Sequence, residues 1–237
     1  MTHNTTQLKH DVRPEAGFTI VELLIATTVF SMVLMVLLYG VLSFTHAYYS
    51  GINASTTQDT ARTIINSVAQ SIEFSGSSIL TSVSGNTYYF CTGGNTYYFI
   101  LGSMYDGATP TSGDPGLFVQ PGTCTSSPNF SATGSKEMLE ANMRITYFQL
   151  AQPSVSSRLY NVSIGLAYGD SDLLCNNSKD GSPGGCIGGT LNTQGISVIG
   201  SNADDVVCKQ TSGSEFCAHA GLSTTVSLRV ANGALAP

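Results

Sequence analysis

The stretch "GFTIVELLIATTVFSMVLMVLLYGVLSFT", residues 17–45, contains a long apolar run with one ionisable side chain, Glu22. The run covers residues 18–45 and exceeds the roughly 20 residues that a helix needs to cross the hydrocarbon core of a bilayer. A secretory signal peptide has an apolar region of only about 7–15 residues, followed by a cleavage site of small residues. Because this run is longer and no Ala-x-Ala site closes it, the sequence predicts a transmembrane helix over residues 18–45.

The distribution of positive charge around this run predicts its orientation. The polar residues 1–17 include Lys9 and Arg13, whereas the first Lys or Arg after the run is Arg62. Positive residues next to a membrane span favour the cytoplasmic side. We therefore expect the N-terminus in the cytoplasm and the bulk of the chain outside it.

Glu22 has two interpretations. An acidic side chain at the centre of a spanning helix costs roughly 2.5–3.5 kcal/mol, and less near the end of the helix. Glu22 lies five residues into the run and is in the first interpretation a tolerated interfacial residue. In the second, it is retained because it meets a positive partner in the membrane. An N-terminal amine created by cleavage just before the helix would be such a partner.

The segment "GFTIVELLI", residues 17–25, resembles the processing site of type IV prepilins and type II secretion pseudopilins. The resemblance covers residues 1–45 directly. It implies that prepilin peptidase, a membrane aspartyl protease, cuts between Gly17 and Phe18 and methylates the new N-terminus at Phe18. It also implies that Glu22 pairs with the N-terminal amine of a neighbouring subunit during filament assembly. Unlike many major pilins, the chain has no proline within residues 18–45, and only Gly40 is a mild weak point in the helix.

A second helical segment is expected after the span. Residues 46–60 are polar, and an apolar stripe at helical spacing follows. This stripe predicts an amphipathic helix that packs on the protein's own sheet. Gly51 is a candidate bend or break, and the helix is expected to stop at residues 75–78. The stripe consists of Ala61, Ile64, Ile65, Val68, Ala69 and Ile72.

Beyond residue 79 the patterns are typical of strands. "GNTYYF" occurs at residues 85–90 and again at 94–99, which predicts a β-hairpin. Its tyrosines are expected to pack across the strands, with a ligand platform as the alternative. These tyrosines are Tyr88, Tyr89, Tyr97 and Tyr98.

The remaining strands are predicted from alternating apolar residues. They cover residues 143–150 and 158–169, around a turn at Pro153, and a closing strand at residues 223–230. Residues 102–135 are rich in Gly, Ser, Thr and Pro and are predicted to form a long loop. Residues 170–221 carry four cysteines, and we expect two disulfide-closed loops there.

The six cysteines all lie beyond residue 90 and include no C-x-x-C pair, so a zinc ribbon or a thioredoxin motif is not supported. An even number after a membrane segment indicates disulfides formed outside the cytoplasm. Six cysteines allow fifteen pairings, and we favour sequential pairing because each pair would close one loop. The predicted pairs are Cys91 with Cys124, Cys175 with Cys186, and Cys208 with Cys217.

Several functions find no support in the sequence. Beyond residue 79, six Lys or Arg residues face ten Asp or Glu residues, so no basic surface for nucleic acid is expected. The chain has no G-x-S-x-G motif, and His219 is an isolated base, so we predict no catalytic residues. Asp170 and Asp172 lie in a polar cluster with Asn176, Asn177 and Asp180. The cluster lacks the EF-hand pattern for Ca²⁺, and a solvated loop is the preferred interpretation. No metal and no cofactor are predicted.

Together these patterns predict an α+β protein with a long N-terminal helix packed on a mostly antiparallel β-sheet head with disulfide-closed loops. The expected divisions are a cleaved leader (1–17), a transmembrane or filament-core helix (18–45), an amphipathic helix (46–76) and an extracytoplasmic head (77–237).

The predicted function is structural. We expect a minor pilin of a type IV pilus-like filament, anchored in the cytoplasmic membrane and then displayed on the cell surface. Its expected partners are prepilin peptidase, other pilins or pseudopilins, the pilus assembly platform and the membrane. The alternatives are a J/W-type pseudopilin of type II secretion, a pilus-displayed adhesion module, and a membrane-anchored protein that never enters a filament.

Overall fold

The computed structural model describes residues 17–76, 79–84, 87–108, 116–124, 129, 131, 133–153, 157–176, 206–209 and 213–229. The chain divides into two compact units, Met1–Thr45 and His46–Pro237. The second unit, which we call the head, contains every described strand. The fold is α+β, as predicted, with one long helix, antiparallel sheets and two disulfides in the described residues.

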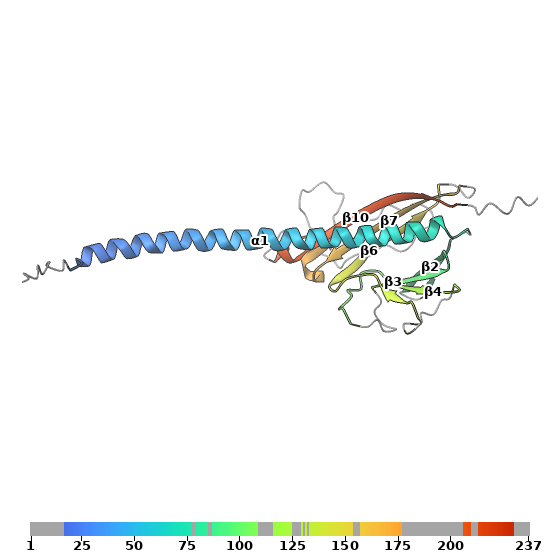
Figure 1. The fold of residues 1–237 in the computed structure, drawn as a ribbon, viewed down its shortest axis with the longest axis horizontal. Helices are drawn as coiled ribbons and strands as arrows, with labels where there is room; N and C mark the ends of the chain where they lie inside the picture. Colours follow the sequence, from blue (N-terminus) through green and yellow to red (C-terminus); the bar gives the residue numbers. More distant parts are fainter. Residues whose placement is uncertain are drawn as a thin grey trace, which may run out of the picture. The chain divides into compact units, whose positions relative to one another are not determined.

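Helix α1 (Ile20–Glu73) is the first element among the described residues (Figure 1). It continues through Gly51, so the suspected break at this glycine is absent. It ends at Glu73, just before the predicted stop, and Gly76 follows in the left-handed region with φ 63°. A glycine there costs little because it has no Cβ to clash with the backbone.

The C-terminal half of α1 buries the predicted stripe. Ala61, Ile64, Val68 and Ile72 are inaccessible to solvent, and Ile65 is nearly so. They join one hydrophobic core with residues of both larger sheets. Figure 1 shows this half of α1 running across strands β10, β7 and β6. The prediction of an amphipathic helix packed on the protein's own sheet is therefore confirmed.

A five-stranded antiparallel sheet has the order β1-β2-β3-β4-β5. The predicted hairpin is confirmed as β2 and β3, which turn through Gly93 and Gly94 at positive φ. Gly93 also meets the helix, because an added Cβ would lie 2.5 Å from the carbonyl oxygen of Ser71. The strands are β1 (Leu80–Ser84), β2 (Thr87–Thr92), β3 (Asn95–Ile100), β4 (Leu117–Pro121) and β5 (Lys136–Glu137).

The prediction of one long loop over residues 102–135 is wrong. Strand β4 lies inside that range and pairs with β3, so that Phe118 is opposite Tyr98. Its apolar part is only Leu117, Phe118 and Val119, all of them buried. Such a short run is hidden among Gly, Ser and Pro residues, and pairing with a neighbouring strand rather than local pattern makes it a strand.

A three-stranded antiparallel sheet has the order β10-β7-β6. Strands β6 (Met143–Ala151) and β7 (Leu159–Tyr168) match the prediction. Strand β10 (Ala218–Ser227) begins five residues before the predicted start at residue 223 and ends before residue 230. Its first residues, "AHAGL", include small side chains that gave no strand pattern, although Ala218 and Ala220 are buried.

A two-stranded sheet completes the head. It pairs β8 (Leu174–Asn176) with β9 (Val206–Cys208), inside the segment predicted to form loops. Leu174 and Val206 form a small second core with Ala167 of β7 and Cys217. Two short 3₁₀ helices, η1 (Ser171–Leu173) and η2 (Ser214–Phe216), flank this sheet in the sequence.

Candidate functional site at the start of the apolar helix and in the head

Glu22 takes part in a capping box at the start of α1. The Thr19 hydroxyl accepts a hydrogen bond from the backbone N–H of Glu22 at 3.2 Å. In return the Glu22 carboxylate accepts from the backbone N–H and the hydroxyl of Thr19, at 3.3 and 3.2 Å. The reciprocal pattern satisfies N–H groups that the first helical turn leaves free. The carboxylate also lies at the positive end of the helix dipole.

Gly17 and Phe18 precede this cap in non-helical conformation. An added Cβ on Gly17 would meet no atom within 4 Å, and Phe18 is 86% exposed. The peptide bond between them is therefore open to a binding partner in the described part of the chain. The capping box would remain if the chain began at Phe18, since Thr19 and Glu22 both follow that bond.

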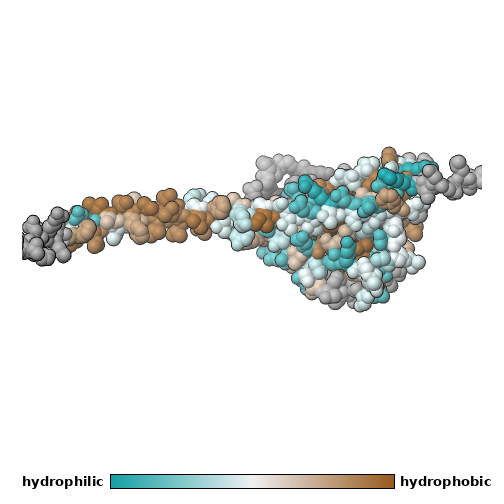
Figure 2. All heavy atoms as spheres, viewed as in Figure 1, coloured by the Kyte–Doolittle hydropathy of each residue, from teal (hydrophilic) through white to brown (hydrophobic). Residues whose placement is uncertain are grey.

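The residues after the cap form an apolar surface on all sides of the helix. Side chains from Ile20 to Phe44 are exposed, including the large apolar ones (Figure 2). Helix α1 is long and apolar enough to cross a membrane. A helix that is apolar all round requires an apolar environment, which a bilayer or the core of a helix bundle provides.

The tyrosines of the predicted hairpin pack across the strands. Tyr97 and Tyr98 are buried. The Phe90 and Tyr97 rings stack with centroids 4.6 Å apart, and the centroids of the Tyr89 and Tyr98 rings are 6.0 Å apart. The Tyr97 hydroxyl lies 2.7 Å from the Ser71 hydroxyl of α1, and burial raises the pKa of Tyr97. Cross-strand packing is confirmed, and the proposed platform is wrong for Tyr97 and Tyr98, whose rings no ligand reaches.

Two of the three predicted disulfides lie among the described residues. Cys91 of β2 is bonded to Cys124, just after β4. Cys208 of β9 is bonded to Cys217, just before β10. The third predicted pair joins Cys175, whose side chain is outside the described set, to Cys186, which also lies outside it.

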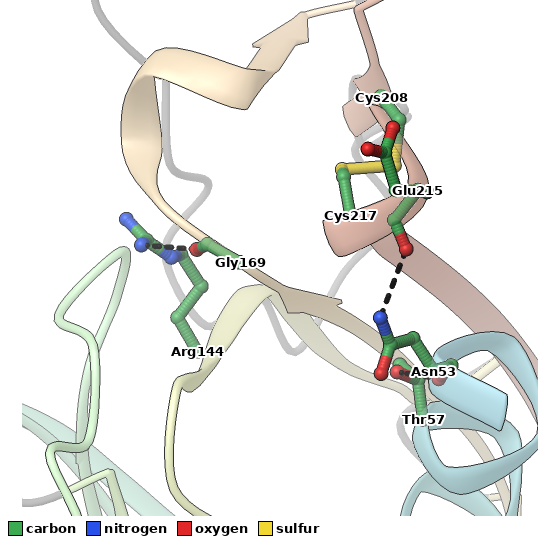
Figure 3. The surroundings of a disulfide bond; sticks show 7 residues. All are labelled: Asn53, Thr57, Arg144, Gly169, Cys208, Glu215 and Cys217. Atoms are coloured by element: carbon green, nitrogen blue, oxygen red, sulfur yellow. Dashed lines mark hydrogen bonds between the residues drawn. A yellow bond between two sulfur atoms is a disulfide. The ribbon is translucent and has the colours of Figure 1, made fainter. Parts of the chain in front are cut away.

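A junction that the sequence did not reveal joins α1 to η2 within the head (Figure 3). Asn53 of α1 donates a hydrogen bond to the Glu215 carbonyl oxygen at 3.0 Å. The Glu215 carboxylate lies 3.1 Å from His46 Nδ1. Its own backbone N–H and His46 lower the pKa of the Glu215 carboxyl. Beside them, the rings of Tyr49 and Phe216 have centroids 5.8 Å apart.

Arg144 is buried and Glu137 is half-buried, and no sequence pattern predicted a role for either charged group. Arg144 donates to the Gly169 carbonyl oxygen at 2.7 Å, and burial lowers the pKa of its guanidinium while Asp170 opposes that effect (Figure 3). The Glu137 carboxylate accepts four backbone N–H bonds, yet burial still raises its pKa. Both groups bind backbone atoms of neighbouring loops, which is a structural role.

The predicted polar cluster near residue 170 gives no metal site in the described residues. Asp170 and Asp172 are exposed, while Asn177 and Asp180 of the same cluster lie outside the described set. Among the residues that the structure describes, no group of three or more His, Cys, Asp or Glu side chains could hold a metal ion.

Comparison with known proteins gives one result. The family model for the prokaryotic N-terminal methylation motif matches residues 12–38. No curated protein and no solved structure matches the chain. The matched segment includes the open bond after Gly17, the capping box and residues 20–38 of the exposed apolar helix. The chain thus carries a prokaryotic N-terminal methylation motif followed by a long apolar helix, an arrangement consistent with a type IV pilin-like protein.

Proposed function

We propose that this chain is the precursor of a minor pilin, a low-abundance structural subunit of a type IV pilus-like filament. The observation that carries the proposal is the methylation motif at residues 12–38, followed by a helix whose apolar side chains are exposed. A head closed by disulfides supports export from the cytoplasm. Residues 1–17 are the leader, 18–45 the membrane and filament-core helix, and 46–237 the exported part.

Processing takes place at the bond between Gly17 and Phe18. The non-helical backbone at both residues supports this assignment, because a protease must hold the peptide bond in an extended conformation that a helix does not offer. Prepilin peptidase hydrolyses this bond, and a methyl group from a methylsulfonium donor replaces one hydrogen of the new Phe18 amine, which leaves as a proton. The leader stays in the cytoplasm, and the rest remains anchored through α1.

Assembly depends on Glu22. In the membrane its carboxylate pairs with the methylated amine of a neighbouring subunit, which offsets the cost of placing both charges in an apolar region. The capping box supports this role, because it holds the carboxylate beside Thr19, close in sequence to the mature N-terminus. The apolar helices then pack against one another as subunits add head to tail without closing into a ring.

A type II secretion pseudopilin is the second candidate, because the motif is shared by both classes. The adhesion alternative depends on four tyrosines, and two of them, Tyr97 and Tyr98, are buried. Only Tyr88 and Tyr89 remain partly accessible on that hairpin.

The test is the intact mass and N-terminal sequence of the protein purified from membranes of a host with prepilin peptidase. We expect a chain that begins at N-methyl-Phe18, and a full-length chain when Gly17 is replaced by Val. Gly40→Val is the matched control, because an added Cβ meets no atom within 4 Å at either glycine. A wild-type chain that still begins at Met1 would contradict processing and favour a membrane-anchored protein outside any filament.

A further inference from the structure

Three aromatic rings form an exposed cluster in the head. Tyr48 and Tyr49 lie on α1, with ring centroids 6.0 Å apart, and Phe216 belongs to η2. Tyr48 is 56%, Tyr49 45% and Phe216 50% exposed. We call these three residues the aromatic cluster. Its rings come from two elements that are distant in sequence, so the tertiary fold brings them together.

Phe216 is held in this exposed position by the contacts around it. Its neighbour Glu215 is bound to Asn53 through the carbonyl oxygen and lies beside His46 through the carboxylate. Its other neighbour, Cys217, is fixed to β9 by a disulfide. The exposure of Phe216 is therefore part of the fold. Exposed aromatic side chains that the fold holds together form a candidate interaction surface.

The helix between Phe18 and Tyr48 is about as long as a bilayer is thick. From Phe18 to Tyr48 the chain advances 30 residues, roughly 45 Å as a helix at 1.5 Å per residue. A bilayer with its headgroups is about 40–45 Å thick. Tyr48 and Tyr49 therefore fall at the outer edge of the membrane when Phe18 is at the inner edge.

The sequence offers no basic anchor at this level. No Lys or Arg occurs between Arg13 and Arg62, so the outer end of the span lacks the basic side chains that commonly hold a helix at the interface. Aromatic side chains serve the same purpose, because their rings suit the acyl boundary and a tyrosine hydroxyl can bond to headgroups or water. Tyr48 and Tyr49 lie three and four residues beyond the apolar run.

We propose that the aromatic cluster is a lipid-binding surface that seats the head on the outer leaflet while the subunit waits in the membrane. The inference rests on the proposed function, since it requires a precursor anchored through α1. The surface contacts the bilayer interface, because the cluster begins within one helical turn of the end of the predicted membrane span. Phe216 extends this surface from α1 to η2.

The test uses tryptophan fluorescence, because the chain contains no Trp and each introduced Trp is the only one. The full chain carrying Phe216→Trp is reconstituted into phosphatidylcholine vesicles with lipids spin-labelled either near the headgroup or deep in the acyl chain. Leu34→Trp, within the span, reports insertion of the helix. Leu80→Trp reports a head residue in water, because Leu80 is exposed and lies in β1, which follows the C-terminal end of α1. Tyr48→Trp tests the cluster without altering η2.

We expect Phe216→Trp and Tyr48→Trp to lose emission to the headgroup label more than to the deep label. Leu34→Trp should lose emission to the deep label, and Leu80→Trp to neither. If Phe216→Trp behaves like Leu80→Trp while Leu34→Trp is quenched, the helix is inserted but the cluster faces water or another protein, and the proposal is overturned. If Leu34→Trp is not quenched either, the membrane anchoring in the proposed function fails as well.

Discussion

Residues 20–45 and residues 46–73 belong to the same helix, α1, and differ in where their apolar side chains lie. In the first part, apolar residues occupy every face and are exposed. In the second, those between Ala61 and Ile72 form one stripe that is buried against the two larger sheets. The first part therefore depends on an apolar environment outside the chain, and the second on the protein's own core. One helix serves an intermolecular and an intramolecular purpose.

An aspartate introduced into the first part and one introduced into the second should impair different properties of the protein. Ile64→Asp places an unpaired charge in the core, where the side chain is inaccessible, and we expect it to cost more than about 5 kcal/mol, enough to unfold the head. Leu34→Asp should leave the head folded and cost roughly 2.5–3.5 kcal/mol in membrane insertion. Urea unfolding in detergent, followed by near-ultraviolet circular dichroism, measures the first effect, and membrane fractionation measures the second. A folded Ile64→Asp head would contradict the assignment of this part of α1 to the core.

The two described disulfides should stabilise only the head, and by different amounts. They close loops with sequence separations of 33 and 9 residues. The chain-entropy relation predicts a loss of about 4 kcal/mol without Cys91–Cys124 and about 3 kcal/mol without Cys208–Cys217.

Paired Cys→Ala variants, compared by urea unfolding in detergent, measure these losses. Membrane fractionation of the same variants serves as the control and should be unchanged. An equal or reversed order would show that local contacts, such as those of Glu215, outweigh loop length.

Sequence patterns predicted the parts of the fold that depend on local periodicity. The stripe from Ala61 to Ile72 and the hairpin of β2 and β3 repeat apolar residues at the spacing of a helix and of strands. Strand β4 and the start of β10 were not predicted. Strand β4 has only three apolar residues, and the start of β10 has small ones, Ala218 and Ala220. Their strand state comes from pairing with neighbours, which a local pattern does not contain.

The candidate site divides in the same way. Gly17, Phe18 and Glu22 are adjacent in the chain, so a motif describes them. The junction of His46 and Asn53 with Glu215 joins residues far apart, 162 positions in the case of Asn53, and no pattern in either segment points to the other. Glu137 and Arg144 were missed for a related reason, since their partners are backbone atoms that any residue supplies.

Two acidic residues, Glu22 at the start of α1 and Glu215 of η2, allow a further prediction. Glu22 contacts Thr19 of its own helix end, whereas Glu215 joins α1 to η2. Glu22→Ala should remove the capping box, which costs about 1 kcal/mol in helix stability, and leave insertion and head folding unchanged.

If the carboxylate also pairs with a neighbouring amine, the same variant should be strongly depleted from filaments, as measured by immunoblotting of sheared pili. Glu22→Gln is the control, because it keeps a capping oxygen without the charge and should be depleted as well. Normal incorporation of Glu22→Gln would show that capping alone explains the residue.

The smallest expected effect concerns pH and Glu215. A carboxyl whose pKa in the folded protein lies below that in the unfolded chain stabilises the fold at neutral pH, and this contribution is lost as pH falls through the folded-state pKa. Glu215 is such a group, so its contribution should begin to fall near pH 4.3, the ordinary value for Glu, and should shrink further as the pH drops toward the lower pKa of the folded state. Glu215→Gln should therefore lower the urea midpoint of the head more at pH 7 than at pH 3.

Glu137 makes the comparison between variants necessary. Burial raises its pKa, so its contribution has the opposite sign: it is present at low pH and is lost as pH rises through the folded-state pKa. The wild-type profile sums both groups, and only the difference between wild type and Glu215→Gln isolates the junction. Glu140→Gln, at an exposed position, is the matched control and should leave the midpoint unchanged at both pH values. A Glu215→Gln difference that is as large at pH 3 as at pH 7 would mean that the residue acts through packing, and that its charge does not hold α1 to η2.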